Sequence, residues 1–307
     1  MADAAPDNWV DKWAPAATRP YLRLMRADRP IGTWLLFWPG AWAITLAAPQ
    51  VGKYVLYPEI LYLIGLFLVG AFVMRGAGCV WNDYTDRDID AQVARTASRP
   101  IPSGQVSASS ALVFLGVLLL IGFLILIQLS WAAIGLGVAS LALIAIYPFA
   151  KRFTWWPQVF LGLAINWGAL MGWAAVTGSL SAAPLFLYLA GICWTLGYDT
   201  IYAHQDKEDD ALIGVKSTAL RLGANTKTWL WGFYGLTLVF LALAGVFAGI
   251  GWVYFAGLFM GGFHLMRQVR DTDLDRPEEC LAAFKSNRDF GIIILACLFA
   301  GTPGTSL

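Results

Sequence analysis

Long runs of hydrophobic residues fill most of the chain, and short polar segments separate them. Most of these runs approach the length of about 20 residues that a helix needs to cross the hydrocarbon core of a bilayer. The pattern therefore predicts an all-α, polytopic membrane protein of about nine transmembrane helices. We place the helices at residues 31–49, 57–81, 109–129, 131–149, 156–176, 183–203, 228–248, 250–266 and 289–302.

Lysine and arginine residues occur on alternate connections between these helices. They precede the first predicted helix and follow the second, fourth, sixth and eighth, whereas the other connections contain only Lys53. Because positively charged loops stay in the cytoplasm, we expect the N-terminus and the loops near residues 90 and 210 to be cytoplasmic. The predicted organisation is a cytoplasmic segment, a single transmembrane domain and a tail, at residues 1–30, 31–302 and 303–307.

The N-terminal segment resembles neither a signal peptide nor a mitochondrial presequence. It has no early apolar run, and it contains Asp3, Asp7 and Asp11, whereas presequences are poor in acidic residues. We therefore expect a multi-pass protein of the bacterial inner (plasma) membrane, with its long acidic loops and its chemistry on the cytoplasmic side.

Composition excludes several classes of protein. Hydrophobic residues make up 58% of the 307 residues and charged residues 13%, which is too apolar for a soluble domain. A net charge of +1 leaves no basic surplus to neutralise phosphates, so nucleic acid is not an expected partner. The four cysteines show no CxxC spacing, so neither a zinc site nor a disulfide framework is predicted.

The acidic segment NDYTDRDID follows the second predicted helix. If the helix continues through it, Asn82, Asp86 and Asp90 recur every four residues and share one face. Asp83 and Asp88 are expected to point elsewhere. Oxygen-bearing side chains on one stripe suit a hard cation such as Mg²⁺.

A second acidic segment, YDTIYAHQDKEDD, follows the sixth predicted helix and forms another stripe, with Asp199, Tyr202, Asp206 and Asp210. Either segment alone would suit a solvated helix cap. Two such segments at the ends of membrane helices favour a functional site, because carboxylates in membrane helices are rare. Since Mg²⁺ completes its shell with substrate phosphates, the pair predicts a diphosphate site.

Several basic residues could supply the positive charge that a diphosphate requires. Lys151 and Arg152 follow the fourth predicted helix, and Arg75 lies within the second, a turn or two before Asn82. Arg99 lies in the segment SRPIPSG. Each of these residues also fits the positive-inside pattern.

These segments together resemble the UbiA family of intramembrane prenyltransferases. NDYTDRDID is similar to the family's NDxxDxxxD motif, and YDTIYAHQDKEDDALIGVKSTA is similar to its second signature. RADRPIGTWLLFWPG, SRPIPSG and YPFAKRFTWWPQ resemble segments of its 4-hydroxybenzoate polyprenyltransferase branch. The resemblance covers residues 20–300 in order and spacing.

The resemblance implies helices around a central cavity that opens to lipid and carries a cytoplasmic cap. It implies Mg²⁺-dependent transfer of a polyprenyl group from polyprenyl diphosphate to the ring of 4-hydroxybenzoate, in ubiquinone biosynthesis. Carried across residue by residue, it implies metal and diphosphate contacts from Asn82, Asp86, Asp90, Asp206 and Asp210.

The same resemblance assigns the diphosphate to Lys151 and Arg152 and places Asp199 and Tyr202 at motif positions that contact substrate. The implied catalytic residues are Asp86, Asp90, Asp206, Asp210 and Arg152. A 4-hydroxybenzoate carboxylate requires a cation or hydrogen-bond donors, and its candidates are Arg29, Arg75 and Arg99.

Two alternatives stay open. One is the same fold with another acceptor, such as haem, a chlorophyllide or a quinone precursor. The other is a cation transporter, which would carry acidic residues near the bilayer midplane in several helices. Here the acidic residues gather at one face beside basic residues, which favours the prenyltransferase.

Overall fold

A computed structural model describes residues 7–92 and 96–302, with the side chains of residues 209, 210 and 213 left undescribed. The described residues form helices and no strand, which confirms the all-α prediction. Six helical stretches among them are long and apolar enough to cross a membrane: Ile31–Val51, Pro58–Asp90, Ala108–Leu126, Trp131–Phe153, Pro157–Thr177 and Thr218–Ala248. The predicted count of nine spans is therefore not confirmed.

The chain divides into two compact units. One contains Met1–Trp34 and Leu68–Gln128, and the other contains Leu35–Phe67 and Leu129–Leu307. The boundaries fall inside α3 (Ile31–Ala47) and α4 (Pro58–Asp90), so each of these helices contributes to both units. A single transmembrane domain stays a prediction.

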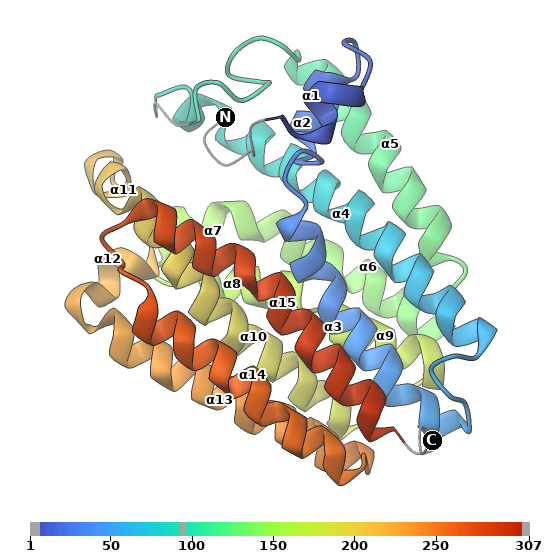
Figure 1. Cartoon of the computed structure of the whole chain (residues 1–307). Helices are drawn as coiled ribbons and strands as arrows, with labels where there is room; N and C mark the ends of the chain where they lie inside the picture. The colour runs from blue at the N-terminus through green and yellow to red at the C-terminus, as the bar shows by residue number, and fades with distance from the viewer. Residues whose placement is uncertain (1–6, 93–95, 303–307) are drawn as a thin grey trace. The chain divides into compact units, whose positions relative to one another are not determined.

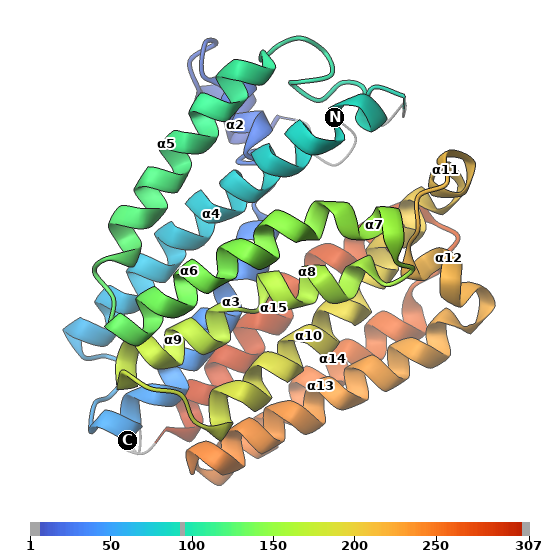
Figure 2. The ribbon, with the colours of Figure 1, turned by 180° about the vertical axis from the view of Figure 1, so that it is seen from behind.

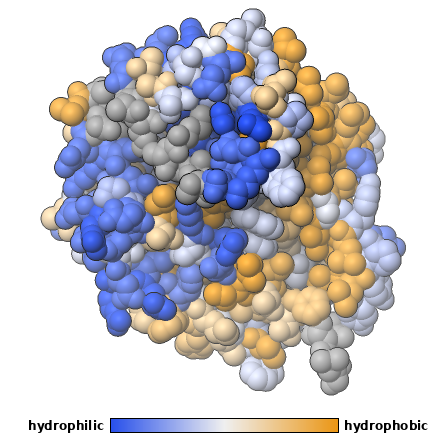
Figure 3. All heavy atoms as spheres, turned by 45° about the horizontal axis from the view of Figure 1, so that its top comes forward, coloured by the Kyte–Doolittle hydropathy of each residue, from blue (hydrophilic) through white to orange (hydrophobic). Residues whose placement is uncertain are grey.

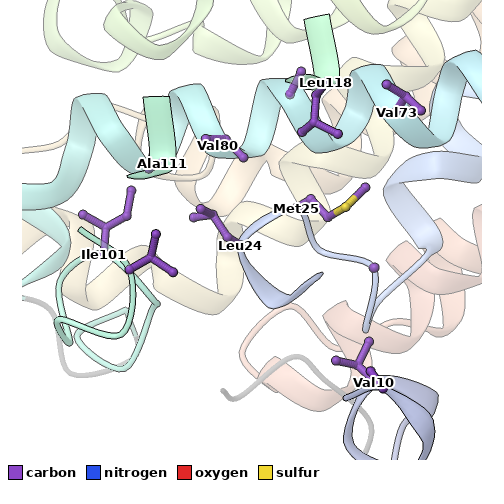
Figure 4. Close-up of a cluster of buried hydrophobic side chains, with 12 residues drawn as sticks. Val10, Leu24, Met25, Val73, Val80, Ile101, Ala111 and Leu118 are labelled. Atoms are coloured by element: carbon purple, nitrogen blue, oxygen red, sulfur yellow. The ribbon is translucent and has the colours of Figure 1, made fainter. Parts of the chain in front are cut away.

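The first unit contains α1 (Trp9–Trp13), α2 (Arg19–Leu24), most of α4, and α5 (Ala108–Leu126). A cluster of buried hydrophobic side chains holds the N-terminal segment, α4, α5 and the connection between them together; Figure 4 shows Leu24, Val80, Ile101 and Leu118 among its members. The cluster therefore holds the N-terminal segment and the connection between α4 and α5 against the end of α4.

Helix α4 continues without a break through the first acidic segment and ends at Asp90. Its 33 residues span about 50 Å at 1.5 Å per residue, which exceeds the bilayer core of about 30 Å. Thr96 Oγ1 donates to the carbonyl of Asp90 at 2.8 Å and so satisfies one of the free acceptors at the helix end. The acidic segment is therefore helical, as its spacing required.

Helix α5 exposes leucine, valine and phenylalanine side chains along most of its length. This surface is orange in Figure 3, on the side where Figure 1 places α5. An exposed apolar surface of this extent is expected for a helix that faces lipid.

The second unit is built around α10 (Ala182–Ala203), α13 (Thr226–Ala248), α14 (Trp252–Asp271) and α15 (Pro277–Gly301), which lie side by side in Figures 1 and 2. Helices α8 (Pro157–Ile165) and α9 (Gly168–Thr177) pack against α10, and α6 (Trp131–Ile146) packs against α8 and α9. Trp42 of α3 meets Trp194 of α10 and Phe290 of α15, and all three rings are fully buried. These aromatic contacts form the centre of the unit.

The fifth predicted span is two helices rather than one. The chain breaks between α8 and α9 at Asn166 and Trp167. The Asn166 side-chain amide donates to the Gly162 carbonyl and to Thr195 Oγ1, both at 2.8 Å. A break in a membrane helix requires such contacts, because lipid offers the freed backbone groups no hydrogen bonds.

Helix α9 crosses α3 at very close range through glycines. A Cβ on Gly172 would lie 2.5 Å from the Gly40 carbonyl oxygen, and one on Gly168 would lie 3.2 Å from the Gly40 nitrogen. Gly168 and Gly172 are four residues apart, and small residues at this spacing let membrane helices approach each other closely. Gly40 follows Pro39 within α3, and neither residue ends the helix.

We expect Gly172→Ala to destabilise the protein by about 1–3 kcal/mol, because the added methyl group meets backbone that cannot rotate away. Thermal unfolding in detergent measures this effect. Gly135→Ala is the matched control, since a Cβ there meets nothing within 4 Å. An unchanged unfolding midpoint for Gly172→Ala would show that α9 and α3 do not pack this closely.

Candidate active site

The first acidic segment presents three buried carboxylates at the end of α4. Asp83 and Asp86 are fully buried and Asp90 is 5% exposed. They are three, four and seven residues apart, which places them on one helical face. Asp88 is exposed, as expected. The expectation that Asp83 points away from the stripe was wrong.

Two arginines pair with two of these three carboxylates. Arg26 Nη2 lies 2.7 Å from Asp83 Oδ1, and Arg99 Nη1 lies 3.2 Å from the same oxygen. The same nitrogen of Arg99 lies 2.6 Å from Asp90 Oδ2. Burial alone would lower the pKa of Arg26, but the negative charge and hydrogen bond of Asp83, together with Cys79 and Asp28, raise it above its ordinary value. Arg26 therefore keeps its positive charge beside Asp83.

Sequence reasoning missed Arg26 and the role of Asp83. Arg26 was counted only as a positive-inside residue, and it lies 57 positions from its partner. Its backbone adopts φ +61°, a left-handed conformation that is uncommon outside glycine. No local pattern marks such a residue, although the RADRP segment that contains it was part of the family resemblance.

The other two candidate arginines of the first unit also have partners. Arg29 pairs with Asp28 at 3.2 Å. Arg75 donates to the Cys79 sulfur one turn along α4 and lies across the start of α3, where a side chain at Gly32 would collide with its guanidinium. Asn82 is half-buried on α4. The structure thus gathers Asn82, Arg75, Arg99 and the carboxylates of Asp86 and Asp90 in one unit.

The second acidic segment lies in the other unit, and its helix is not continuous. Helix α10 ends at Ala203, a 3-10 turn covers His204–Asp206, and α11 (Lys207–Ile213) follows. The expected continuous helix is therefore interrupted between Tyr202 and Asp206, and a 3-10 turn advances each residue by a larger angle than an α-helix. Asp199, Tyr202 and Asp206 are half-buried, and the side chain of Asp210 lies outside what the structure describes.

Aromatic and polar contacts hold this turn in place. The Tyr202 ring lies 4.4 Å from the ring of Phe284 on α15. His204 Nε2 lies 3.2 Å from Thr226 Oγ1 at the start of α13. Burial, and after it Lys207, lowers the pKa of His204 to about 4, so the ring is neutral at pH 7. His204 is thus available as a neutral hydrogen-bonding anchor.

The predicted basic pair lies on α7 (Ala150–Phe153), in the same unit as the second acidic segment. The Arg152 guanidinium lies 5.1 Å from the centre of the Phe149 ring. The backbone N–H of Lys216 donates to the Lys151 carbonyl at 3.2 Å, so the chain that leaves α11 returns to α7. Lys216 is therefore a further cation whose backbone contacts the pair, and its ammonium lies 5.7 Å from the centre of the Trp155 ring.

The donor set fits Mg²⁺ bound together with a phosphate. Among the described residues, no three His, Cys, Asp or Glu side chains converge to hold a metal ion by themselves. Mg²⁺ in enzymes is commonly held by one or two carboxylates and completed by substrate phosphates and water. Carboxylates on α4 beside fixed arginines provide oxygen ligands of this kind, and buried Asp83 Oδ2 has no hydrogen-bond partner.

Comparison with known proteins gives a consistent result. Residues 32–294 match the model of the UbiA prenyltransferase family. The mitochondrial 4-hydroxybenzoate polyprenyltransferase of Drosophila pseudoobscura pseudoobscura is 52% identical over 288 residues, which cover 94% of this chain and 71% of that protein. This relative is mitochondrial, and so are similar relatives from other animals and a plant, which overturns the expectation of a bacterial inner membrane.

Solved structures share the fold. A UbiA homologue from Aeropyrum pernix K1 matches with a TM-score of 0.71 and 24% identity, covering 87% of this chain and 97% of that one. A UbiA homologue from Archaeoglobus fulgidus, bound to DMAPP and Mg²⁺, matches with a TM-score of 0.63 and 17% identity, covering 91% and 98%.

Proposed function

Because the chain belongs to the UbiA prenyltransferase family, we propose that it transfers a polyprenyl group from a polyprenyl diphosphate to the ring of 4-hydroxybenzoate. The observation that carries the proposal is the buried acidic face of α4, which pairs with two arginines. This face occurs in a chain that is 52% identical to a protein named 4-hydroxybenzoate polyprenyltransferase. A transporter is not favoured, since no described feature sets these acids near the middle of several helices.

We propose that the acidic segments hold the metal–diphosphate group. Asn82, Asp86 and Asp90 would supply oxygen ligands from α4, and Asp206 and Asp210 would supply them from the second segment. A bound Mg²⁺ would neutralise the charge that grows on the departing diphosphate. The Mg²⁺ bound with DMAPP in the Archaeoglobus fulgidus homologue supports a divalent cation as part of this group.

The remaining residues would bind and orient the substrates. Lys151 and Arg152 would hold the diphosphate and stabilise its negative charge as the allylic C–O bond breaks and its electron pair leaves with the diphosphate. Asp199 and Tyr202 would contact substrate beside them. For the acceptor carboxylate the candidates are Arg29, Arg75 and Arg99, and Arg75 is favoured, because Arg99 bridges two carboxylates and Arg29 pairs with Asp28.

The new bond would form between the allylic carbon and the ring carbon ortho to the phenol, and that ring carbon would then lose its proton. Exclusion of water is essential, because water would capture the allylic cation. The apolar helices of the chain supply a water-poor environment and can accept a long prenyl tail from lipid.

The test is prenyl transfer by purified protein in detergent, with labelled polyprenyl diphosphate and a panel of aromatic acids, quinone precursors and haem. We expect 4-hydroxybenzoate to be prenylated in preference to the other acceptors. Transfer to another member of the panel alone would assign the chain to a different activity of the family. Absence of transfer to every acceptor would contradict the proposal.

We propose that the protein resides in a mitochondrial membrane, as its named relatives do, with both acidic segments on one side. The concentration of positive charge on alternate loops supports a common side. Single cysteines at positions 88 and 208, placed in a cysteine-free background, are expected to react with an impermeant maleimide from the same side. Labelling of the two positions from opposite sides would contradict this arrangement.

A further inference from the structure

Asp83, near the end of α4, binds two polar segments that are far from each other in the sequence. One contains Arg26 and the other contains Arg99. Asp83 is fully buried, and its Oδ1 accepts from Arg26 at 2.7 Å and from Arg99 at 3.2 Å. The Arg99 nitrogen involved also donates to Asp90 Oδ2 at 2.6 Å. One arginine nitrogen therefore bridges two carboxylates that are two helical turns apart.

Arg26 compensates Asp83 independently of Arg99. Its Nη1 donates to the Arg23 carbonyl at 3.3 Å, and its left-handed backbone holds the side chain against α4. A left-handed arginine persists only when its surroundings fix it. Asp83 therefore keeps one cation permanently, and Arg99 is shared between Asp83 and Asp90.

Arg99 is positioned by its loop as well as by its side chain. The Ser103 hydroxyl donates to the Arg99 carbonyl at 2.6 Å, and the Val106 N–H donates to the Pro100 carbonyl at 2.9 Å. At the start of the same loop, the Thr96 hydroxyl binds the Asp90 carbonyl. Both the carboxylate and the backbone of Asp90 are therefore held by this loop.

We propose that Arg99 is the resident counter-ion of Asp90, and that a divalent cation displaces it from Asp90 toward Asp83. The inference rests on the proposed function, in which Asp90 binds a cation with the diphosphate. A cation that takes Asp90 Oδ2 must replace Arg99 there. Asp83 offers the released guanidinium a second carboxylate, including a buried oxygen, Oδ2, that has no hydrogen-bond partner. Arg99 is 21% exposed, so a carboxylate that takes over from Asp90 lowers the cost of the exchange without being indispensable to it.

Asp83 and Arg99 are thus positioning residues that set how easily the cation binds. Arg99→Gln removes the positive charge that competes with the cation for Asp90, and we expect cation affinity to rise about tenfold. This effect is a modest share of the Coulomb energy between two charges a few ångströms apart at an effective dielectric constant of about 20. Asp83→Asn leaves Arg99 with Asp90 as its charged partner among the described residues, so we expect affinity to fall about tenfold.

A double-mutant cycle of Asp83 and Arg99 separates this exchange from the case in which each charge acts on the cation independently. If Asp83 acts through Arg99, Asp83→Asn changes cation affinity by less than about twofold once Arg99 is glutamine, whereas independent charges would contribute additively. Asp83→Asn also leaves Arg26 without its counter-charge. The cycle is therefore repeated in an Arg26→Gln background, which removes both members of that buried pair.

The measurement is Mn²⁺ binding by electron paramagnetic resonance, on protein in detergent with a non-hydrolysable geranyl thiodiphosphate, so that turnover plays no part. Asp88→Asn is the matched control, because it removes an equal charge from an exposed position on the same helix, and we expect less than a twofold change. Changes of the same sign for Arg99→Gln and Asp83→Asn, or additive effects in the cycle, would overturn the inference.

Two further outcomes would also overturn it. If Arg99→Gln raises the KM for 4-hydroxybenzoate and leaves Mn²⁺ affinity unchanged, Arg99 binds the acceptor and is not a counter-ion. If wild-type protein neither binds Mn²⁺ nor transfers prenyl groups, the proposed function fails together with this inference. Wild-type binding and transfer with an additive cycle would overturn this inference alone.

Discussion

Exhaustive chelation of divalent cations is expected to abolish prenyl transfer, and added Mg²⁺, or Mn²⁺ in its place, is expected to restore it. The physical reason is charge. Asp86, Asp90 and Asp206 are carboxylates, and carboxylates repel a diphosphate unless a cation lies between them. Because the C–O bond breaks with negative charge growing on the diphosphate, loss of the cation removes both binding and stabilisation of the leaving group.

The measurement is labelled product formed in EDTA, followed by back-titration with Mg²⁺. The control is the thermal unfolding midpoint in EDTA, which shows that the protein stays folded while inactive. Undiminished transfer after chelation, with the metal content verified, would rule out a metal–diphosphate mechanism and leave Lys151 and Arg152 as the proposed contacts of the diphosphate.

Asp86→Asn and Asp206→Asn are each expected to lower turnover at least about 10²-fold, the effect of removing one group that stabilises charge in the transition state. Asparagine keeps the shape of the side chain and removes its charge. Since the two residues are proposed to act on one diphosphate, the double variant should lose far less than the product of the single effects. Turnover is measured with the protein level determined in parallel.

Two exposed acids provide matched controls for these substitutions. Asp88 lies on the same helix as Asp86, and Asp271 lies at the end of α14, paired with the exposed Arg267 and Arg270. Both should tolerate asparagine with turnover within about twofold, as expected of surface positions. If Asp206→Asn were near wild type while Asp86→Asn was inactive, the second acidic segment would be a solvated cap and the two-segment site would be wrong.

The helices were predicted well where hydrophobic residues are continuous and less well where charge interrupts them. The last helix was placed at residues 289–302, whereas α15 begins at Pro277. Its first half carries several charged residues and resembles a loop in composition. Those charges lie on the outer face, while Cys280, Ala283 and Asn287 are buried, so the segment is an amphipathic start to the same helix.

The candidate site was predicted to the extent that it depends on spacing along one helix. The positions of Asp86 and Asp90 on a shared face of α4 follow from their separation of four residues and from the helix that continues through them. The break at His204–Asp206 did not follow from spacing, because an α-helix and a 3-10 turn are equally compatible with so short a polar segment.

The amino-acid sequence by itself determined that this chain is a helical membrane protein with two acidic segments and a set of arginines, because hydrophobic length and residue spacing are properties of each helix alone. The tertiary structure decided which charges meet. Arg26 and Arg99 reach Asp83 only because Leu24, Val80 and Ile101 pack their segments against the end of α4. An ion pair between residues 57 positions apart depends on that packing, so it is decided by the fold of the chain rather than by any local pattern.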